Sequence, residues 1–377
     1  MVQNRFFPEI HGNFGFGCMR LPMKNGQVDY DEFCRMADAF IASGLNYFDT
    51  AHGYIGRQSE TAIRDCVAKR HDRSEFLLTN KLTTPYFNKQ EDIRPFFENQ
   101  LRWCGVDYFD FYLMHAQDKN NYQKYKRCKA YETCYALKAE GLIRHFGISF
   151  HDKAERLDMI LTEHPEIEVV QIQFNYVDYE DASVESKKVY EVCEKHGKPV
   201  IVMEPVKGGS LVNLPDEADR ILRGLNGGSN ASYALRFAAS FPNMAMVLSG
   251  MSNMAQMTDN LSATADFKPL NEIELEAVQK VCGIFQGLNL IPCTSCRYCV
   301  EESECPRDIR IPDLFSAMNA HEAFHNWNTA YYYNNIITGG GHGKASECIR
   351  CGKCEKVCPQ HLPIRGLLKQ VAKTFED

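Results

Sequence analysis

Residues 1–275 alternate between short runs of β-branched and aromatic residues and longer segments of helical periodicity. The helical segments include 31–43, 90–104, 122–140, 152–163 and 182–196. The short runs predict eight strands, at residues 14–17, 45–49, 76–80, 109–113, 144–148, 169–173, 199–203 and 245–249. Alternating strands and helices indicate parallel βαβ units, and eight repeats in about 260 residues predict a (β/α)8 TIM barrel. A doubly wound sheet is the alternative, but no Gly-x-Gly-x-x-Gly run follows the first strand.

The cysteine content is unusual, with 16 copies in 377 residues. Thiols in a reducing compartment rarely form disulfides, so clustered cysteines indicate metal or redox chemistry. Eight cysteines are scattered, and we interpret most of them as small buried hydrophobic residues: Cys18, Cys34, Cys66, Cys104, Cys128, Cys134, Cys193 and Cys282. The other eight form two runs, Cys293-x2-Cys296-x2-Cys299-x5-Cys305-Pro306 and Cys348-x2-Cys351-x2-Cys354-x3-Cys358-Pro359.

The spacing of these runs is typical of iron–sulfur ligands. Three closely spaced cysteines bind three corners of a cube, and a distant fourth cysteine completes it. We assign one [4Fe-4S] cluster to Cys293, Cys296, Cys299 and Cys358, and the other to Cys348, Cys351, Cys354 and Cys305. A pair of zinc sites is the alternative, but zinc sites seldom repeat this three-plus-one pattern with a trailing proline.

This part of the chain resembles a bacterial-type two-cluster ferredoxin, apart from the five residues before Cys305 and a long insert between the runs. Residues 276–377 are therefore predicted to form a small, mostly helical ferredoxin-like domain with two [4Fe-4S] clusters. Residues 1–275 are predicted to form the barrel.

The charge and hydropathy of the chain argue against nucleic-acid-binding, membrane-spanning and secreted proteins. The formal net charge of -7 argues against a nucleic-acid partner. No run approaches the roughly 18 consecutive apolar residues of a membrane-spanning helix, and the first ten residues lack the apolar core of a signal peptide. We expect a cytoplasmic protein without a membrane partner.

Four polar residues coincide with predicted strand ends, where barrel enzymes carry their chemistry. Asp49, Lys81 and His115 follow the second, third and fourth strands, and Tyr54 lies in the loop that Asp49 begins. Each alone has an ordinary structural explanation, such as a helix cap or a core histidine. Together they suit proton transfer, because a cation can stabilise a phenolate whose ordinary pKa is about 10. Tyr54 could then protonate a carbonyl oxygen as hydride reaches the carbon, with His115 as a second donor.

The same segments carry a resemblance to the aldo-keto reductase family. Its signature blocks look like Phe48-Asp-Thr-Ala-His-Gly-Tyr54, Thr79-Asn-Lys81, Tyr112-Leu-Met-His115, Gly141-Leu-Ile-Arg-His-Phe-Gly-Ile-Ser149, Gly15-Phe-Gly-Cys-Met-Arg-Leu-Pro22 and Gln171-Ile-Gln-Phe-Asn175. With the cysteine runs, the similarity over residues 12–266 suggests the subgroup that carries a C-terminal ferredoxin-like domain. The resemblance implies that Asp49, Tyr54, Lys81 and His115 are the catalytic tetrad of an NAD(P)H-dependent reductase.

The resemblance also implies where the nicotinamide cofactor binds. Ser149 and Gln171 correspond to carboxamide contacts, although Phe150 replaces the asparagine that the family usually places after the serine. Met203 replaces the aromatic residue that often stacks on the nicotinamide, and Met19 and Arg20 are further expected contacts.

The phosphate loop of the cofactor is expected at residues 249–260, with contacts from Ser249, Gly250, Met251, Gln256 and Asn260. NADPH-preferring relatives usually place a lysine and an arginine where this loop has Gly250 and Gln256. Without them a 2′-phosphate would lose charge-assisted hydrogen bonds of roughly 1.5–3 kcal/mol each. The loop therefore favours NADH, unless another loop supplies the cation.

The two predicted domains leave three functional hypotheses open. In the first, the protein reduces an aldehyde or ketone, or runs the reverse oxidation, and the clusters are structural or have a side role. In the second, it is an iron–sulfur electron-transfer protein whose barrel holds a flavin or a substrate reduced through the clusters, although no flavin motif is present. In the third, the barrel is a silent scaffold. The expected partners are a small carbonyl or alcohol substrate and, in the second hypothesis, an external electron carrier.

Overall fold

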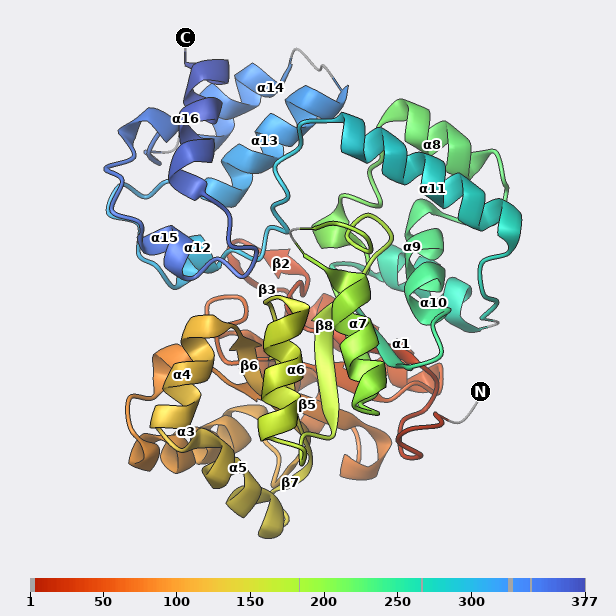
Figure 1. Cartoon of the computed structure of the whole chain (residues 1–377), viewed down its shortest axis with the longest axis vertical. Coiled ribbons are helices and arrows are strands. Elements are labelled where there is room, and N and C mark those ends of the chain that lie inside the picture. Colours follow the sequence, from red (N-terminus) through yellow and green to blue (C-terminus); the bar gives the residue numbers. More distant parts are fainter. Residues whose placement is uncertain (1–3, 183, 266, 325–327, 340, 377) are drawn as a thin grey trace. The chain divides into compact units, whose positions relative to one another are not determined.

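The computed structural model describes residues 4–182, 184–265, 267–324, 328–339 and 341–376 (Figure 1). The chain folds into two compact units. Unit 1 comprises Met1–Pro205 and Ala234–Leu270, and unit 2 comprises Val206–Tyr233 and Asn271–Asp377. The domain boundary between residues 275 and 276, inferred from the sequence, stays a prediction.

Unit 1 contains a closed barrel of eight parallel strands in the order β1-β10-β9-β8-β7-β6-β5-β4. The predicted TIM barrel is confirmed, and all eight predicted strands are present with ends shifted by a few residues. The strands are β1 (Phe14–Gly17), β4 (Tyr47–Asp49), β5 (Leu77–Leu82), β6 (Phe109–Gln117), β7 (Ile143–Phe150), β8 (Val169–Gln173), β9 (Val200–Met203) and β10 (Met244–Gly250). A small hairpin, β2 (Met23–Lys24) and β3 (Gln27–Val28), follows β1.

Helices follow the strands and pack around the barrel, for example α6 and α7 beside β8 (Figure 1). The main helices are α1 (Tyr30–Ala42), α2 (Ser59–Ile63), α3 (Gln90–Cys104), α4 (Lys119–Arg127), α5 (Ala130–Ala139), α6 (Ala154–Glu163), α7 (Ser186–Lys195), α9 (Asn230–Ala239) and α10 (Met254–Ala265). Short turns are η1 (Arg64–Ala68), a π-helix, and the 3-10 helices η2 (Arg73–Glu75) and η3 (Thr84–Tyr86). The single helical segment predicted over 122–140 is wrong, because Lys129 adopts a left-handed φ of 48° that separates α4 from α5.

Helix α1 shows how the sequence fixes the strand that carries Asp49. Its buried residues Phe33, Met36, Ala37 and Phe40 recur at helical spacing and form one apolar stripe. The Phe40 ring packs against Phe16 of β1 and Phe48 of β4, at centroid distances of 5.5 and 5.2 Å. Fully burying such a ring contributes roughly 1.5–3 kcal/mol, so this stripe holds the end of β4 in place.

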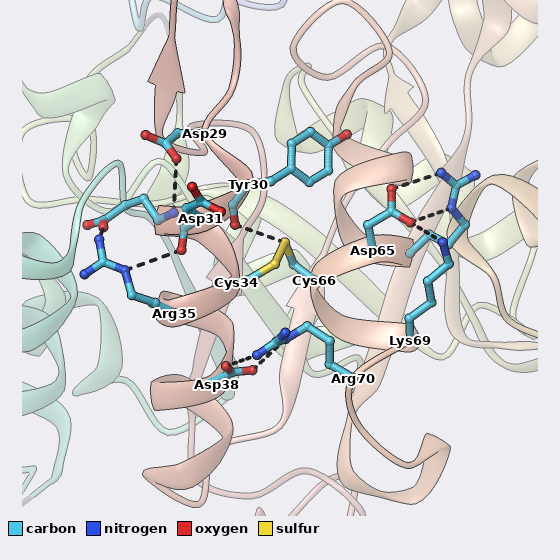
Figure 2. Close-up of a disulfide and its surroundings, with 12 residues drawn as sticks. Asp29, Tyr30, Asp31, Cys34, Arg35, Asp38, Asp65, Cys66, Lys69 and Arg70 are labelled. Carbon is cyan, nitrogen blue, oxygen red and sulfur yellow. Dashed lines mark hydrogen bonds and ion pairs between the residues drawn. A yellow bond between two sulfur atoms is a disulfide. The ribbon is translucent and has the colours of Figure 1, made fainter.

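Two of the scattered cysteines, interpreted above as small buried residues, instead form a disulfide. Cys34 of α1 bonds to Cys66 of η1, with their Cα atoms 4.5 Å apart (Figure 2). The two elements pack side by side, and a second link between them joins Arg70 Nε to Asp38 Oδ1 at 3.1 Å. The pairing depends on this packing, because 32 residues separate the two cysteines in the sequence.

Unit 2 is mostly helical, as predicted. Its elements are η4 (Lys207–Gly209), α8 (Asp216–Arg223), α11 (Glu272–Gly287), α12 (Tyr298–Glu301), α13 (Ile311–Phe324), α14 (Asn328–Tyr331), the π-helix η5 (Tyr332–Ile337), η6 (Ala345–Glu347), α15 (Lys353–Lys356) and α16 (Ile364–Phe375). Its core includes Leu314, Phe315, Tyr333, Leu368 and Val371.

The segment after β9 belongs to unit 2 because it packs against the first cysteine run. Gly208 has a φ of +64°, and a Cβ at this position would lie 2.4 Å from the Thr294 carbonyl oxygen. Only glycine allows the two backbones to approach this closely. Across the described part of the chain, no helix is long and apolar enough to cross a membrane.

Candidate active site and cluster ligands

Strand ends bring the predicted tetrad together at one end of the barrel. Asp49 ends β4, and Lys81 and His115 lie near the ends of β5 and β6. Lys81 Nζ donates to Asp49 Oδ1 at 2.6 Å and to the Thr50 carbonyl oxygen at 2.9 Å. The same Nζ lies 5.0 Å from the ring centroid of Tyr54, whose ring is 5.9 Å from that of His115. The four side chains are nearly inaccessible to solvent.

Burial sets the electrostatics of this group. The loss of water lowers the pKa of Lys81 and raises the pKa of Asp49, and each charge opposes the shift of the other. Burial and the nearby Lys81 also hold the pKa of His115 well below its ordinary value of 6.5. His115 is therefore a neutral imidazole at pH 7. Its Nδ1 lies 2.8 Å from the Thr83 hydroxyl, which fixes the ring.

The predicted nicotinamide contacts lie at the same end of the barrel. Gln171 of β8 donates to Asp49 Oδ2 at 3.2 Å, so it contacts the tetrad directly. Ser149 Oγ accepts a hydrogen bond from the backbone N–H of Ala116 at 2.7 Å. Because Ala116 directly follows His115 in the sequence, this bond holds the Ser149 hydroxyl close to the backbone of His115. Met203 ends β9 and is half-buried, and Met19 follows β1 and is also half-buried.

The predicted phosphate loop joins β10 to α10 and is ordered by its own polar side chains. Asn260 donates to Ser249 Oγ at 2.8 Å, and Gln256 Oε1 accepts from the N–H of Ser252 at 2.7 Å. Met251 is fully buried beneath the loop.

Arg20 lies directly against this loop. A Cβ at Gly250 would lie 3.1 Å from the Cβ of Arg20, a tight contact that shows how closely Arg20 approaches the loop. The Ser252 hydroxyl donates to the Arg20 carbonyl oxygen at 2.8 Å, and Arg20 Nη2 faces Glu204 Oε1 at 3.8 Å. The structure thus brings the Arg20 cation to the loop, from the segment after β1.

Sequence reasoning missed an acidic residue at the start of α10. Glu32 Oε1 accepts from the backbone N–H of Met254, the first residue of α10, at 3.0 Å. The carboxylate comes from α1, 222 positions away in the sequence. No local signal could identify it, because only the packing of α1 beside α10 makes the contact.

A buried polar network behind the tetrad was also missed. Glu60 Oε2 lies 2.6 Å from His52 Nδ1, and its Oε1 accepts from Asn80 Nδ2 at 2.8 Å. Gln100 donates to the Lys81 carbonyl oxygen at 3.1 Å and to Asn80 Oδ1 at 3.0 Å. Strand periodicity could have identified Thr83, since it lies two residues after Lys81 and therefore on the same side of the chain.

The two cysteine runs share one backbone conformation. Ser295 and Arg297 of the first run have positive φ angles of 53° and 67°, and Arg350 and Gly352 have angles of 60° and 75° at the matching positions of the second. A short helix follows at α12 and α15, and these helices contact each other. Left-handed residues in such loops direct backbone N–H groups into a concavity that suits anions such as an iron–sulfur cluster.

Four of the eight cysteines lie around one space. Cys305, Cys348, Cys351 and Cys354 line a single cavity, so the fourth cysteine of the first run lies with the first three of the second. In the other set, burial raises the pKa of the Cys299 thiol, and the neighbouring thiols of Cys296, Cys293 and Cys358, together with Cys354 of the first set described, raise it further.

Thiols that surround a cavity fit a cube, because each thiolate of a cube binds a different iron. No group of three or more cysteine, histidine or carboxylate side chains among the described residues is arranged to hold one metal ion. The four thiols that line one cavity are the kind of donor set that the spacing predicts, and the pairing of sets across the two runs stays a prediction.

Comparisons with known proteins agree with both parts of the chain. Residues 13–282, more than half of the chain, match the Aldo/keto reductase family. Residues 292–362 match the 4Fe-4S dicluster domain. The oxidoreductase YqkF of Bacillus subtilis is 25% identical over 300 residues, which cover 70% of this chain and 90% of that protein.

Solved structures show the same barrel. An aldo-keto reductase from Klebsiella pneumoniae in complex with NADPH aligns with a TM-score of 0.57 and 20% identity, over 71% of this chain and 90% of that one. The holo form of aldo-keto reductase AKR11C1 from Bacillus halodurans aligns with a TM-score of 0.58 and 23% identity, over 71% and 91%.

Proposed function

This chain belongs to the aldo/keto reductase family and carries a 4Fe-4S dicluster domain, and from that premise we propose that it interconverts a small carbonyl compound and its alcohol with a nicotinamide cofactor. The observation that carries the proposal is the buried Lys81–Asp49 pair beside the Tyr54 ring. A silent scaffold has no use for two buried charges, because removing charges from water costs several kcal/mol per ion.

Each residue of the tetrad has a defined role in this proposal. A reduced nicotinamide supplies the hydride for the carbonyl carbon. Tyr54 donates its hydroxyl proton to the carbonyl oxygen, and Lys81 stabilises the resulting phenolate while Asp49 orients the lysine. His115 remains neutral and donates a hydrogen bond to the same oxygen when the Thr83 hydroxyl donates to Nδ1. In the alcohol direction, Tyr54 phenolate accepts the proton.

Ser149, Gln171, Met203, Met19 and the 249–260 loop are the proposed cofactor contacts, and we propose NADH as the preferred cofactor. The fold neighbour from Klebsiella pneumoniae holds NADPH, which supports a nicotinamide cofactor in this barrel. However, the Glu32 carboxylate, which also pairs with Arg35, accepts from the first N–H of α10, and a 2′-phosphate bound there would meet this carboxylate. Arg20, the cation against the loop, faces Glu204.

Tyr54→Phe tests the proposed reduction. NADH consumption by the purified, cluster-loaded protein would be followed without oxygen, with benzaldehyde, cyclohexanone and methylglyoxal as probes. The variant should lower kcat by roughly 10²–10⁴-fold, as expected for loss of a general acid. NADH affinity, measured by fluorescence titration, should change less than twofold. A Tyr54→Phe protein with undiminished turnover would refute the proposed role of the tyrosine.

The paired cysteine sets favour a second candidate function, electron transfer. Two [4Fe-4S] clusters exceed what one structural crosslink requires, and each cluster exchanges one electron at a time. An anaerobic NADH titration separates the two functions. Bleaching of the cluster band would support an electron-transfer function with a carbonyl substrate, a flavin or an external carrier as the terminus. An unbleached band with NADH bound would support the carbonyl reductase function without electron transfer to the clusters.

We also propose a reducing compartment, the cytoplasm, because the eight cluster cysteines require free thiolates. The Cys34–Cys66 disulfide is then of the reversible kind, since disulfides in reducing compartments are mostly transient.

A further inference from the structure

Unit 2 contains a large cavity that is separate from the cysteine-lined one. Its volume is about 680 Å³, within the usual range of roughly 300–1,000 Å³ for small-molecule sites. Helix α13 and the π-helix η5 form its walls, and Arg310, just before α13, also lines it. None of its lining residues belongs to the tetrad, the predicted cofactor contacts or the predicted cluster ligands.

The body of the cavity is apolar. Ala317 and Ala320 of α13 lie opposite Ile336, Ile337 and Tyr332 of η5. The two small alanines leave room for a flat group between the helices, and Tyr332 offers a ring edge or face against which another ring can pack. The walls include a π-helix, a form that is rare in proteins and frequent at functional sites.

Two nitrogen-bearing side chains also line the cavity. Arg310 and His342 both line it. His342 Nδ1 lies 2.5 Å from Asp308 Oδ2. Arg310 Nε lies 3.3 Å from the same imidazole nitrogen and 3.7 Å from Asp308 Oδ1.

These contacts leave donor capacity toward the cavity. In the described part of the chain, the two terminal nitrogens of Arg310 have no hydrogen-bond partner. The acidic side chain of the lining, Asp313, is already paired with Arg297, whose Nη1 lies 3.0 and 3.3 Å from the two carboxylate oxygens of Asp313. A planar guanidinium with unused N–H groups matches the two oxygens of a carboxylate.

We propose that this cavity binds a flat aromatic acid, with its ring between α13 and η5 and its oxyanion on Arg310. The site lies beside the predicted cluster. Arg310 is flanked by Ile309 and Ile311, which line the cavity of Cys305, Cys348, Cys351 and Cys354. The inference does not depend on the proposed reductase reaction, because it uses only residues of unit 2.

The test is isothermal titration calorimetry of the full-length, cluster-loaded protein under anaerobic conditions. The probes are 2-naphthoate and its uncharged analogue 2-naphthalenemethanol. The wild-type protein should bind 2-naphthoate more tightly than the alcohol. Arg310→Gln should raise the Kd for 2-naphthoate about tenfold, while the Kd for the alcohol changes less than twofold. Ala320→Phe should abolish binding of both probes at this site.

The variants also separate this cavity from the barrel, which could hold the same probes. Binding at the barrel would be identical in wild type and Ala320→Phe, so coincident isotherms of these two proteins would overturn the proposal. An unchanged 2-naphthoate Kd in Arg310→Gln would equally overturn the role of the oxyanion. Tyr331→Ser is the matched control, because Tyr331 is exposed at the end of α14 and does not line the cavity. The visible cluster band of each variant reports that unit 2 is folded, and Arg310→Gln decides the result if Ala320→Phe loses that band.

Discussion

Individual buried charges dominate the candidate active site at the residue scale. Lys81 is fully buried and Asp49 is almost so, and each is satisfied by the other and by one further group. Removing one partner of such a pair typically costs about 3–5 kcal/mol, whereas replacing both with apolar groups is often neutral. The pair is therefore weak evidence for stability and stronger evidence for chemistry.

Glu32 gives a residue-scale prediction about cofactor preference. Glu32→Gln keeps a hydrogen-bond acceptor for the N–H of Met254 but removes the negative charge at the start of α10. The ratio of kcat/KM for NADPH to that for NADH should rise by roughly three- to tenfold, which corresponds to about 1 kcal/mol. Glu32→Asp, which keeps the charge, serves as the control. An unchanged ratio in Glu32→Gln would show that the 2′-phosphate does not approach this carboxylate.

His115 gives a prediction about pH. Burial lowers its pKa in the folded protein, while the unfolded chain binds the proton near pH 6.5. The His115 contribution is therefore fully present above about pH 6.5. Below that pH it is lost by up to about 1.4 kcal/mol per pH unit, until the lowered folded-state pKa is reached. Urea denaturation between pH 7.5 and 5.5 should show a shallower loss of stability in His115→Gln than in the wild type. Equal slopes would contradict a depressed pKa.

At the scale of secondary-structure elements, helix α1 makes contacts with several other elements of the barrel. Helix α1 buries an aromatic stripe on β1 and β4, carries Glu32 to α10 and carries Cys34 to η1. One helix thus connects the strand of Asp49, the predicted phosphate loop and the disulfide. A shift of helix α1 would therefore alter the position of Asp49 through the packed side chains of α1 and β4, and not through a flexible loop.

The disulfide is the element-scale prediction. Closing a loop of this length typically stabilises a protein by about 2–4 kcal/mol. The Cys34→Ser and Cys66→Ser variants should each lower the free energy of unfolding of the oxidised protein by that amount, and reductant should bring the wild type to the same value. Alkylation and peptide mass spectrometry without reductant should show both thiols protected. Cys282→Ser is the control, since Cys282 lies elsewhere in the chain and takes no part in this disulfide. Full alkylation of Cys34 in the untreated protein would contradict the pairing.

At the scale of the whole molecule, the two units obtain stability in different ways. The closed barrel of unit 1 pairs every strand with two neighbours, so it has no exposed sheet edge. Unit 2 has no strand ladder among its described elements, and its core lies beside the cluster cysteines. Metal binding to such a unit is linked to its folding.

The crossed assignment of cluster ligands gives the whole-molecule prediction. The purified protein should contain about eight irons, from two four-iron clusters. Cys305→Ala and Cys348→Ala should each lose about half of the iron and leave the same electron paramagnetic resonance signal after reduction. Cys293→Ala should leave the other signal. If Cys305→Ala and Cys293→Ala left the same signal, each run would hold its own cluster and the crossed assignment would be wrong.

The sequence by itself determined what depends on local pattern. The eight strands follow from short apolar runs, and the tetrad positions follow from strand ends such as Asp49 and Lys81. The cysteine spacing predicts cluster loops before any fold is known, because ligands three residues apart are neighbours in any compact loop. The error over 122–140 was also local, since helical periodicity continues through Lys129 and does not reveal its left-handed backbone.

Only the tertiary structure decided the contacts between residues distant in the sequence. The Cys34–Cys66 bond and the contact of Glu32 with α10 cannot be recognised from the local sequence around these residues. The cavity in unit 2 likewise exists because α13, η5 and Arg310 pack around one space. The physical reason is that periodicity fixes which face of an element is apolar, whereas packing fixes which other element covers that face.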